Sequence, residues 1–520
     1  MLKKMLAASL LLCMSLMSVQ AQNKLSIDNV YSTYLRNSGT IMANKQIKGY
    51  FFFYLSDKVD RKTNEYTLQI LDENLNKVRD IKFEDGKKVN LLEAAYNGGT
   101  LSFLFQDEKE RQLTMKIYSL EGKLLYTYTN EYSRKTEQLM QAYTTLHTDE
   151  GTNQNVFDVG TQGYVSVMPV RDGKDRTYEV DFFGSDKKGF WKYIPQDDEE
   201  KFAAAEYLGN TDSLIILQVM KRKRLMSHKI SSHIVGINFV TKKKVFDIDG
   251  DDDEFLLLPS TISMQKSTGN FIIAGTYFDK DASVGKDASK GMAIYVMSTD
   301  GKIISKAYNS WEKDFAKYIH ATSKGKIDNV GYLFIHNMIQ AANGNFYVVG
   351  EGYKRQASAG GMALKVLSTA AGANNNIGVT KIVVTDMVIM TFDSNFKITG
   401  AKIYDKTNNT ATNSSISDFN SQHLIAMYLK SIGAFDYDFT TGDDDNTNFS
   451  VCFSDYVKDS DYKGQTFNTI RFNGTKFTQD KIQLKSKASK MKVFPAKPGS
   501  VMILEYFKKD KRIDLRLEKV

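Results

Sequence analysis

A concentrated group of basic side chains is the first feature of this sequence that could bind a ligand. The group comprises Lys221, Arg222, Lys223, Arg224, His228 and His233. A second basic pair, Lys354 and Arg355, is predicted to lie at the same end of the fold as the loop that carries this group. Ammonium and guanidinium groups that converge can hold an anionic ligand, whereas a solvated basic hairpin is the alternative. His228 and His233 are five residues apart without a third ligand, so the pattern predicts no zinc site.

An acidic segment over residues 247–254 offers the second possible chemistry. It contains five aspartates and one glutamate, whose hard oxygen atoms suit a calcium ion. Gly250 is the fourth residue of the segment, however, and an EF-hand loop has its glycine at the sixth position. The alternative is a solvated acidic turn, and we predict no metal here.

Signatures of catalysis and cofactor binding are absent from the sequence. We find no Gly-x-Ser-x-Gly elbow in a usable context, no His-Glu-x-x-His helix and no phosphate-binding glycine loop. Cys452 lies in an alternating strand pattern, which is typical of a buried apolar cysteine. Carboxylate pairs for glycoside chemistry stay possible, because a repeat fold can assemble them from distant segments. We therefore predict no catalytic residue and no cofactor.

The N-terminus carries the pattern of a cleaved secretory signal. Lys3 and Lys4 precede an apolar run over residues 5–17, and Val19-Gln20-Ala21 fits the small-x-small rule. We predict a signal peptide over residues 1–21 and an exported chain, periplasmic or extracellular. After residue 21 no apolar run reaches the length that spans a bilayer, so no membrane span is expected. The mild positive charge of this exported chain argues against a nucleic-acid partner.

Alternating apolar and polar residues recur along the whole chain, which is typical of half-buried strands. Two segments repeat each other closely: Thr268–Gly275 matches Asn343–Gly350. Each repeat unit has four predicted strands joined by Asn, Asp and Gly turns. Similar units fit at about 40–83, 88–130, 155–195, 203–249, 258–308, 335–404 and 434–484. The segment 489–520 supplies three strands, and an alternating strand near Leu25 could complete them.

Residues 22–520 are therefore predicted to form a single all-β domain, a β-propeller of eight four-stranded blades. Seven blades, a β-sandwich array or two separate β-domains are the alternatives. The N-terminal strand would close the last blade and leave no exposed sheet edge. The Gly-Asn-Phe and Asp-Gly-Lys pattern, as in 269–271 and 300–302, resembles the blade repeat of exported bacterial β-propeller proteins of unknown function. The resemblance implies the fold and the compartment, but no activity.

One end of the predicted propeller carries the long connections. They cover 221–233, 279–291, 309–330, 356–384 and 405–433. Two of them have helical periodicity: 311–319, where Trp311 begins an aromatic face, and 419–432, with Leu424, Met427 and Tyr428 on one face. These helices either pack their apolar side down or present an exposed aromatic lip. Loops on a rigid scaffold commonly carry function, so this elaborated end is the predicted binding face.

These patterns favour an exported, non-enzymatic propeller that binds an envelope protein, peptide or glycan. The expected contact residues are Lys354, Arg355, Trp311 and the group Lys221, Arg222, Lys223, Arg224, His228 and His233, which we call the basic loop. A propeller hydrolase or lyase acting on polysaccharide or peptidoglycan is the alternative, with acidic or histidine side chains converging near the centre of the ring. The chain could also be a purely structural envelope protein.

Overall fold

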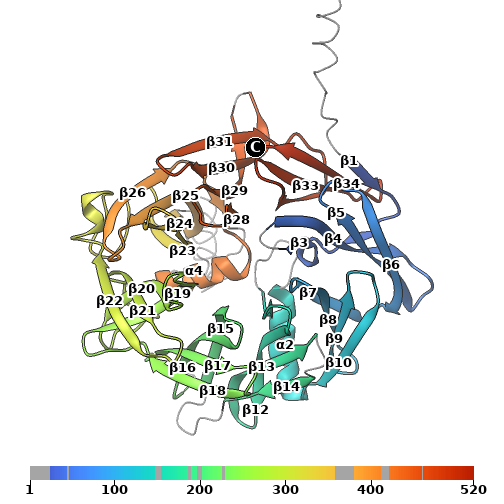
Figure 1. Cartoon of the computed structure of the whole chain (residues 1–520), viewed down its shortest axis with the longest axis horizontal. Helices are drawn as coiled ribbons and strands as arrows, with labels where there is room; N and C mark the ends of the chain where they lie inside the picture. Colours follow the sequence, from blue (N-terminus) through green and yellow to red (C-terminus); the bar gives the residue numbers. More distant parts are fainter. Residues whose placement is uncertain are drawn as a thin grey trace, which may run out of the picture.

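The computed structural model describes residues 24–43, 46–146, 154–185, 189–195, 202–224, 229–357, 380–411, 421–459 and 461–520. The predicted signal peptide and His228 lie outside these residues, as does most of the connection 356–384. The all-β class is confirmed, because antiparallel strands make up most of the structure. Figure 1 shows the sheets following one another in chain order around a ring.

The first half of the ring contains three groups of strands. The first is β2 (Ser32–Thr33), β3 (Gly39–Ala43), β4 (Gln46–Asp57), β5 (Thr63–Asp72) and β6 (Lys77–Gly86). The second is β7 (Val89–Tyr96), β8 (Thr100–Asp107), β9 (Gln112–Ser119) and β10 (Leu124–Glu131). The third is β11 (Val156–Asp158), β12 (Gly163–Asp172), β13 (Asp175–Gly184) and β14 (Phe190–Tyr193).

Strands β15 to β18 form the next group, and one parallel pair between Arg176 and Phe202 joins it to β13. These strands are β15 (Phe202–Asn210), β16 (Leu214–Arg222), β17 (Ser231–Asn238) and β18 (Lys243–Asp249). The fifth group is β19 (Phe255–Met264), β20 (Phe271–Asp279), β21 (Gly291–Met297) and β22 (Ile303–Ser310). The sixth is β23 (Tyr332–Gln340), β24 (Phe346–Ala357), β25 (Thr380–Phe392), β26 (Ile398–Tyr404) and β27 (Asn409–Thr410).

The last two groups bring the chain back to its start. The seventh is β28 (Tyr437–Gly442), β29 (Phe449–Lys458), β30 (Lys463–Phe472) and β31 (Phe477–Gln483). The eighth combines β1 (Lys24–Ile27) with β32 (Lys490–Pro495), β33 (Ser500–Phe507) and β34 (Arg512–Lys519). Here β1 pairs antiparallel with β34, in the register Lys24 to Arg516. The two ends of the described chain therefore share one sheet, and this arrangement is compatible with a propeller-like protein.

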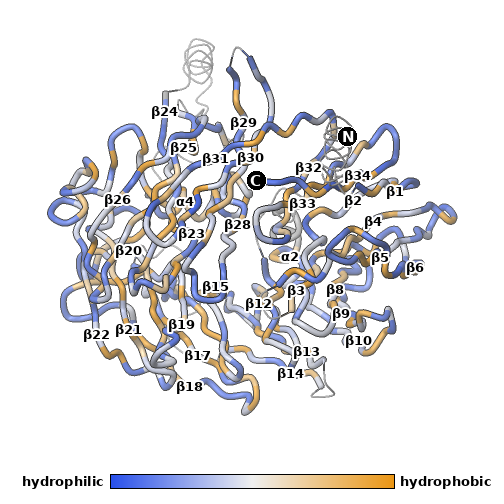
Figure 2. The backbone as a smooth tube through the Cα atoms, turned by 45° about the horizontal axis from the view of Figure 1, so that its top comes forward, coloured by the Kyte–Doolittle hydropathy of each residue, from blue (hydrophilic) through white to orange (hydrophobic). Residues whose placement is uncertain are grey.

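Strand β4 shows how the sheets are held together. Tyr50, Phe52 and Tyr54 point to one side and pack with the sheet of β33, while Phe51 and Phe53 pack with the sheet of β8. All five are buried, as the sequence predicts for a strand between two sheets. Comparable apolar clusters join each other pair of successive sheets. In Figure 2 the hydrophobic colour follows the strands and the hydrophilic colour gathers at the loops.

Helical segments are few among the described residues. They are η1 (Leu35–Asn37), α2 (Arg134–Leu146), η2 (Phe315–Lys317) and α4 (Gln422–Ser431). The prediction over 419–432 is confirmed by α4, but the segment 311–319 contains only the short 3-10 turn η2. Helix α2 was not predicted from the sequence. None of the described helices is long and apolar enough to cross a membrane.

Of the two alternatives for residues 311–319, the exposed aromatic lip does not form. Trp311, Phe315 and Ile319 are buried in the core between the fifth and sixth sheets, whereas Tyr318 is 42% exposed. Burial of three large apolar side chains gives more free energy than the regular backbone of an isolated short helix, and so it selects the turn. The apolar-side-down alternative therefore describes this connection.

Candidate functional site

Helix α4 lies near the centre of the ring, where Figure 1 shows it beside β23 and β28. The hydroxyl of Ser421 caps its start by accepting the backbone N–H of Leu424 at 3.3 Å. Ile425 and Leu429, four residues apart, are fully buried against Tyr353 and neighbouring residues of β25. The sequence pattern favoured a face led by Leu424, which is instead 39% exposed. The helix therefore packs on its Ile425 side.

A buried charged network fixes both ends of the segment that carries α4; we call it the clamp. The Nζ of Lys406 lies 3.2 Å from Oε1 of Glu351 and also pairs with Asp436. The other oxygen of Glu351 accepts a hydrogen bond from Nε2 of His336 at 2.9 Å. Asn409 donates its amide to Asp436 at 2.6 Å. Since residues 406 and 436 bracket α4, the clamp ties the base of this segment to strand β24.

The carboxylate of Glu351 also accepts hydrogen bonds from the backbone at the start of the next sheet. The backbone N–H groups of Asp436 and Tyr437 donate to it at 3.0 and 3.2 Å. Burial opposes its charge, but Lys406 and His336 hold the pKa of Glu351 below its usual value. The same two carboxylates raise the pKa of Lys406 despite its burial. Glu351 and Lys406 therefore form an ionised pair at neutral pH, whereas burial raises the pKa of the third member, Asp436, to about 7.

A pocket opens between α4 and the fourth, fifth and sixth sheets; we call it the helix pocket, and its cavity volume is about 70 Å³. Its lining combines Glu206, Gln218, Pro259, Ser260, Thr276, Phe278, residues 287–289, Trp311, Lys324, Gly325, residues 332–335, Tyr353, Gln422, His423, Ala426, Met427 and Lys430. Three of the five long connections predicted from the sequence contribute to it.

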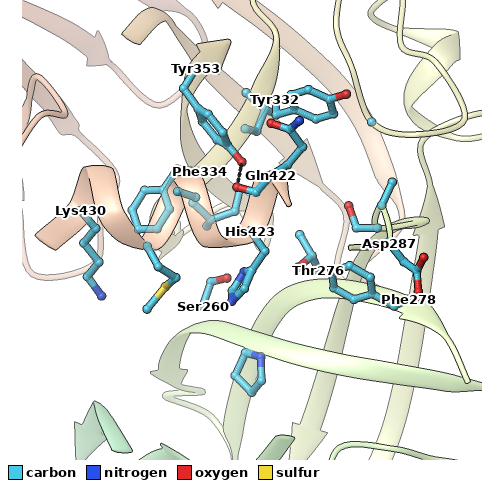
Figure 3. Close-up of a pocket in the computed structure, with 18 of the residues that line it drawn as sticks. Ser260, Thr276, Phe278, Asp287, Tyr332, Phe334, Tyr353, Gln422, His423 and Lys430 are labelled. Carbon is cyan, nitrogen blue, oxygen red and sulfur yellow. Dashed lines mark hydrogen bonds between the residues drawn. The ribbon is translucent and has the colours of Figure 1, made fainter. Parts of the chain in front are cut away.

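Two polar side chains of the helix pocket carry unused hydrogen-bonding atoms. Gln218, on β16, is 5% exposed, and neither its Nε2 nor the Nε2 of His423 has a hydrogen-bond partner among the described residues. Figure 3 shows the imidazole of His423 extending from α4 towards Ser260 and Thr276. Burial lowers the pKa of His423 to about 4, so the ring is neutral at physiological pH.

Three of the four Asp, Glu and Lys side chains that line the helix pocket have partners within the described part of the protein. Lys430 of α4 pairs with Glu206 of β15, and burial lowers the pKa of Lys430 to about 8. Asp287 accepts the backbone N–H of Ser283 at 2.6 Å. Lys324 is exposed.

Aromatic rings form the apolar part of the wall. Tyr332 and Phe334, two residues apart on β23, are half-buried and lie on the same face of the strand. Tyr353 is buried, and its hydroxyl donates to the backbone oxygen of Gln422 at 2.8 Å (Figure 3). This bond links the sixth sheet to the first turn of α4.

Glycine is required at one point of the wall. Gly325 has a φ of +75°, and a Cβ placed there would lie 2.7 Å from Nε1 of Trp311. That indole donates to the hydroxyl of Ser289 at 3.1 Å, which fixes its orientation. Trp311 is thus a wall residue of the helix pocket, although its ring is largely buried.

A second, larger cavity of about 780 Å³ lies among β3, β7, β28 and β32; we call it the central cavity. Asp438 lines it from β28, the first strand of the seventh sheet, and Asp436 lines it from the position directly before that strand. Asp438 is exposed, and Ser454 donates to its carboxylate at 2.7 Å. Opposite them, Arg36 pairs with the buried Glu93 at 3.3 Å.

Comparison with known proteins places the chain in a family. Residues 1–520 match the model described as "Family of unknown function (DUF6770)". The chain belongs to the DUF6770 family. A search of the curated proteins found no match.

Solved structures resemble this DUF6770 protein only distantly. Cobalt-substituted Synechocystis apocarotenoid oxygenase has 7% identity and a TM-score of 0.31, over 52% of this chain and 60% of that chain. A prolyl endopeptidase structure has 9% identity and a TM-score of 0.41, over 92% of this chain and 54% of that chain. A eukaryotic initiation factor has 9% identity and a TM-score of 0.33, over 86% and 96%. The DUF6770 chain spans about 60% of the oxygenase structures that it matches.

Two residues of the basic loop of the DUF6770 protein, Lys221 and His233, contact the carboxylate of Asp247. Lys221 is 9% exposed and lies 3.4 Å from Asp247, whose other oxygen is 2.8 Å from Nδ1 of His233. Lys244 pairs with the same carboxylate at 3.0 Å. Asp247 belongs to the acidic segment that suggested calcium, and these cations hold its pKa far below the usual value despite the opposing effect of burial. Arg222 is half-buried, while Lys223 and Arg224 are exposed.

The remaining predicted contact residues lie apart from that loop. Lys354 and Arg355 are on β24 in the sixth sheet, and Lys354 donates to the backbone oxygen of Asn329. The basic loop lies two sheets away, between β16 and β17. Of the predicted contact residues, Trp311 alone is among those that line the helix pocket. The binding role of the basic residues stays a prediction.

The sequence analysis missed the polar residues of both cavities. Gln218, Ser260 and His423 are on three different elements and become neighbours of one pocket only through the packing of α4 across the ring. The one indication of this site in the sequence was His423, a histidine inside the predicted helix 419–432 and beside apolar residues that were expected to be buried.

Proposed function

We propose that this protein is an exported β-propeller of eight blades over residues 22–520, and that it binds a small extracytoplasmic ligand in the helix pocket. The eight groups of strands, the pairing of β1 with β34 and the apolar clusters between successive sheets support the propeller. The N-terminal pattern of residues 1–21 supports export. The ligand is a free glycan or peptide, or a terminal segment of one on an envelope component.

The convergence of unpartnered polar atoms in an enclosed pocket carries this proposal. Buried polar groups in folded proteins nearly always have hydrogen-bond partners, so Gln218 and His423 are candidates for ligand contacts. Their position beside aromatic rings matches the usual composition of small-molecule sites. The clamp holds α4 in place, so the pocket is pre-formed.

A thermal-shift screen of residues 22–520 against defined short glycans and peptides tests the proposal. We expect at least one class to raise the melting temperature of the protein. Ser260→Tyr would fill the pocket and abolish that rise, without removing any side-chain hydrogen bond that Ser260 makes among the described residues. The double variant Lys223→Ala/Arg224→Ala tests the site predicted from the sequence. Loss of the shift in the double variant, with Ser260→Tyr still responding, would place the ligand at the basic loop and overturn the proposal.

A hydrolase at the central cavity is the second candidate. The observation that favours it is a pair of carboxylates, Asp438 on β28 and Asp436 directly before that strand, which both line the central cavity. Burial raises the pKa of Asp436 to about 7, and a carboxyl group with such a pKa can act as a general acid near neutral pH. Mass spectrometry of the incubated glycans and peptides distinguishes the two functions. Cleavage that is lost in Asp438→Asn would establish the hydrolase, whereas intact ligands favour the binding protein.

A further inference from the structure

We propose that the ligand of the helix pocket is a short, neutral saccharide. This inference rests on the binding function proposed above and names the chemical class of its ligand. Three properties of the lining carry it: its charge balance, its unused hydrogen-bonding atoms and its apolar rings.

The charge balance of the pocket disfavours an ionic ligand. Lys430 already has Glu206 as its counter-ion, and Asp287 is held by a backbone N–H group. The imidazole of His423 is neutral above pH 5, because burial lowers its pKa to about 4. A carboxylate or phosphate entering the pocket would lose its hydration without gaining an available cation in the interior, which is unfavourable. Lys324 also lines the pocket, but it is exposed, so its charge stays hydrated and attracts an anion only weakly.

The unused polar atoms match hydroxyl groups. A primary amide offers donors and an acceptor, and a neutral imidazole offers one of each. The unpartnered Nε2 of Gln218 is a donor, the unpartnered Nε2 of the neutral His423 ring donates or accepts according to its tautomer, and the hydroxyls of Ser260 and Thr276 add two groups that donate as well as accept. A sugar hydroxyl also donates and accepts, so it can satisfy these groups without carrying charge. Amide and imidazole groups left unpaired in a buried site would be costly.

The apolar part of the wall matches the other face of a sugar ring. A pyranose has hydroxyl groups around its edge and C–H groups on its faces, and it can stack those C–H faces on aromatic side chains. Tyr332 and Phe334 offer partly exposed rings on one face of β23, and Phe278 lies at the opposite side of the pocket in Figure 3. The rings and the polar atoms thus surround the same space, as a ligand with an apolar face and a polar edge requires.

Isothermal titration of residues 22–520 with three matched panels tests this assignment. The panels are neutral di- and trisaccharides, the corresponding uronic acids, and uncharged tripeptides. We expect binding of at least one neutral saccharide, at least tenfold tighter than its uronic acid. The affinity should be nearly independent of salt, because no ion pair forms. It should also be constant from pH 6 to 7, below the pKa of about 8 of Lys430 in the same pocket, and fall as the pH approaches 4, where His423 becomes charged.

Variants connect the binding to the named residues. His423→Ala and Gln218→Ala should each weaken saccharide binding by about three- to tenfold, as expected for the loss of a hydrogen bond to an uncharged partner. His320→Ala is the matched control, because the His320 side chain is 83% exposed, pairs with Asp328 and is not among the residues that line the pocket. Equal effects of the three substitutions would overturn the assignment.

The same titrations distinguish the saccharide class from the more general proposal that the helix pocket binds a ligand. Binding of tripeptides or uronic acids in preference to neutral saccharides, blocked by Ser260→Tyr, would overturn the saccharide class and retain the helix pocket as a binding site. No binding by any panel would overturn both. Binding of neutral saccharides that Ser260→Tyr leaves intact would show that another part of the protein recognises them.

Discussion

Replacing Glu351 by glutamine should loosen helix α4 as well as the whole fold. Glu351 is fully buried and accepts hydrogen bonds from His336, from Lys406 and from two backbone N–H groups at the start of β28. The glutamine amide has an NH2 donor where the carboxylate of Glu351 has one of its two acceptor oxygens, whichever way the amide is turned. Two buried donors then face another donor instead of an acceptor.

The magnitude follows from those lost acceptors. Each unsatisfied buried donor costs about 1–3 kcal/mol, and breaking one side of a buried ion pair costs about 3–5 kcal/mol. Asp436 still compensates part of the charge of Lys406. We therefore expect Glu351→Gln to lower the free energy of unfolding by about 3–5 kcal/mol at pH 7.

Glu93→Gln is the matched control for this experiment. Glu93 is also buried, pairs with one cation, Arg36, and accepts the backbone N–H groups of Asn155 and Val156 at the start of β11. The chemical defect is similar, but it lies between the second and third sheets, away from α4. Both variants should be destabilised, and only Glu351→Gln should expose α4.

Hydrogen–deuterium exchange combined with denaturant unfolding provides the measurement. In Glu351→Gln, amides of residues 421–437 should exchange faster under native conditions, whereas in Glu93→Gln the increase should centre on residues 154–158. Equal exchange of α4 in the two variants would show that the clamp does not position the helix. A destabilisation below about 1 kcal/mol in Glu351→Gln would refute the energetic reasoning.

Two further substitutions probe the core and the pocket wall. Burial and the neighbouring charge of Glu179 raise the pKa of Asp181 to about 8. The folded protein therefore retains a proton that the unfolded chain releases near pH 4. The stability of the wild-type protein should then fall as the pH rises from 4 to 8. Asp181→Asn removes that dependence, so relative to the wild type it should become increasingly stabilising over this range, by at most about 1.4 kcal/mol per pH unit. Melting curves of both proteins from pH 4 to 9 measure this difference. A difference that stays constant across the range would contradict the raised pKa. Gly325→Ala should cost about 1–3 kcal/mol, because it strains a residue at φ +75° and pushes against the Trp311 indole. The chain has two tryptophans, so the fluorescence of Trp311 in a Trp191→Phe background should shift on this substitution, and an unchanged spectrum would show that the indole does not move.

The strands could be predicted because their signals are local. Alternation of apolar residues and Asn-Gly or Asp-Gly turns depend on a few neighbouring residues, and the repeat over 268–275 and 343–350 falls on β20 and β24. Helix α2 was missed because only a narrow part of it is apolar; Met140 is buried, while much of its first half is polar. At residues 311–319 the apolar spacing of a helix was present, but the side chains reached the core through a 3-10 turn.

The site could not be predicted because its chemistry depends on partners far away in the sequence. Lys221 and His233 suggested an anion site, yet Asp247, which lies across the sheet on β18, neutralises both. His423 was inconspicuous in a helical pattern, yet it faces residues about 160 positions earlier in the chain. Charge in the sequence therefore pointed to groups that the fold compensates, and the groups it leaves uncompensated are neutral.

This contrast has a physical basis that bears on where the ligand binds. A charged side chain is visible in sequence, but a folded protein buries it only when an opposite charge or several donors satisfy it, as in the clamp. Neutral amides and imidazoles cost less to bury, so a pocket can keep them unpaired until a ligand arrives. Gln218 and His423 lie in such a pocket, and the clamp fixes the helix that carries His423. In the proposed site, the charged residues thus hold the helix in place, and the neutral residues are the ones that would contact the ligand.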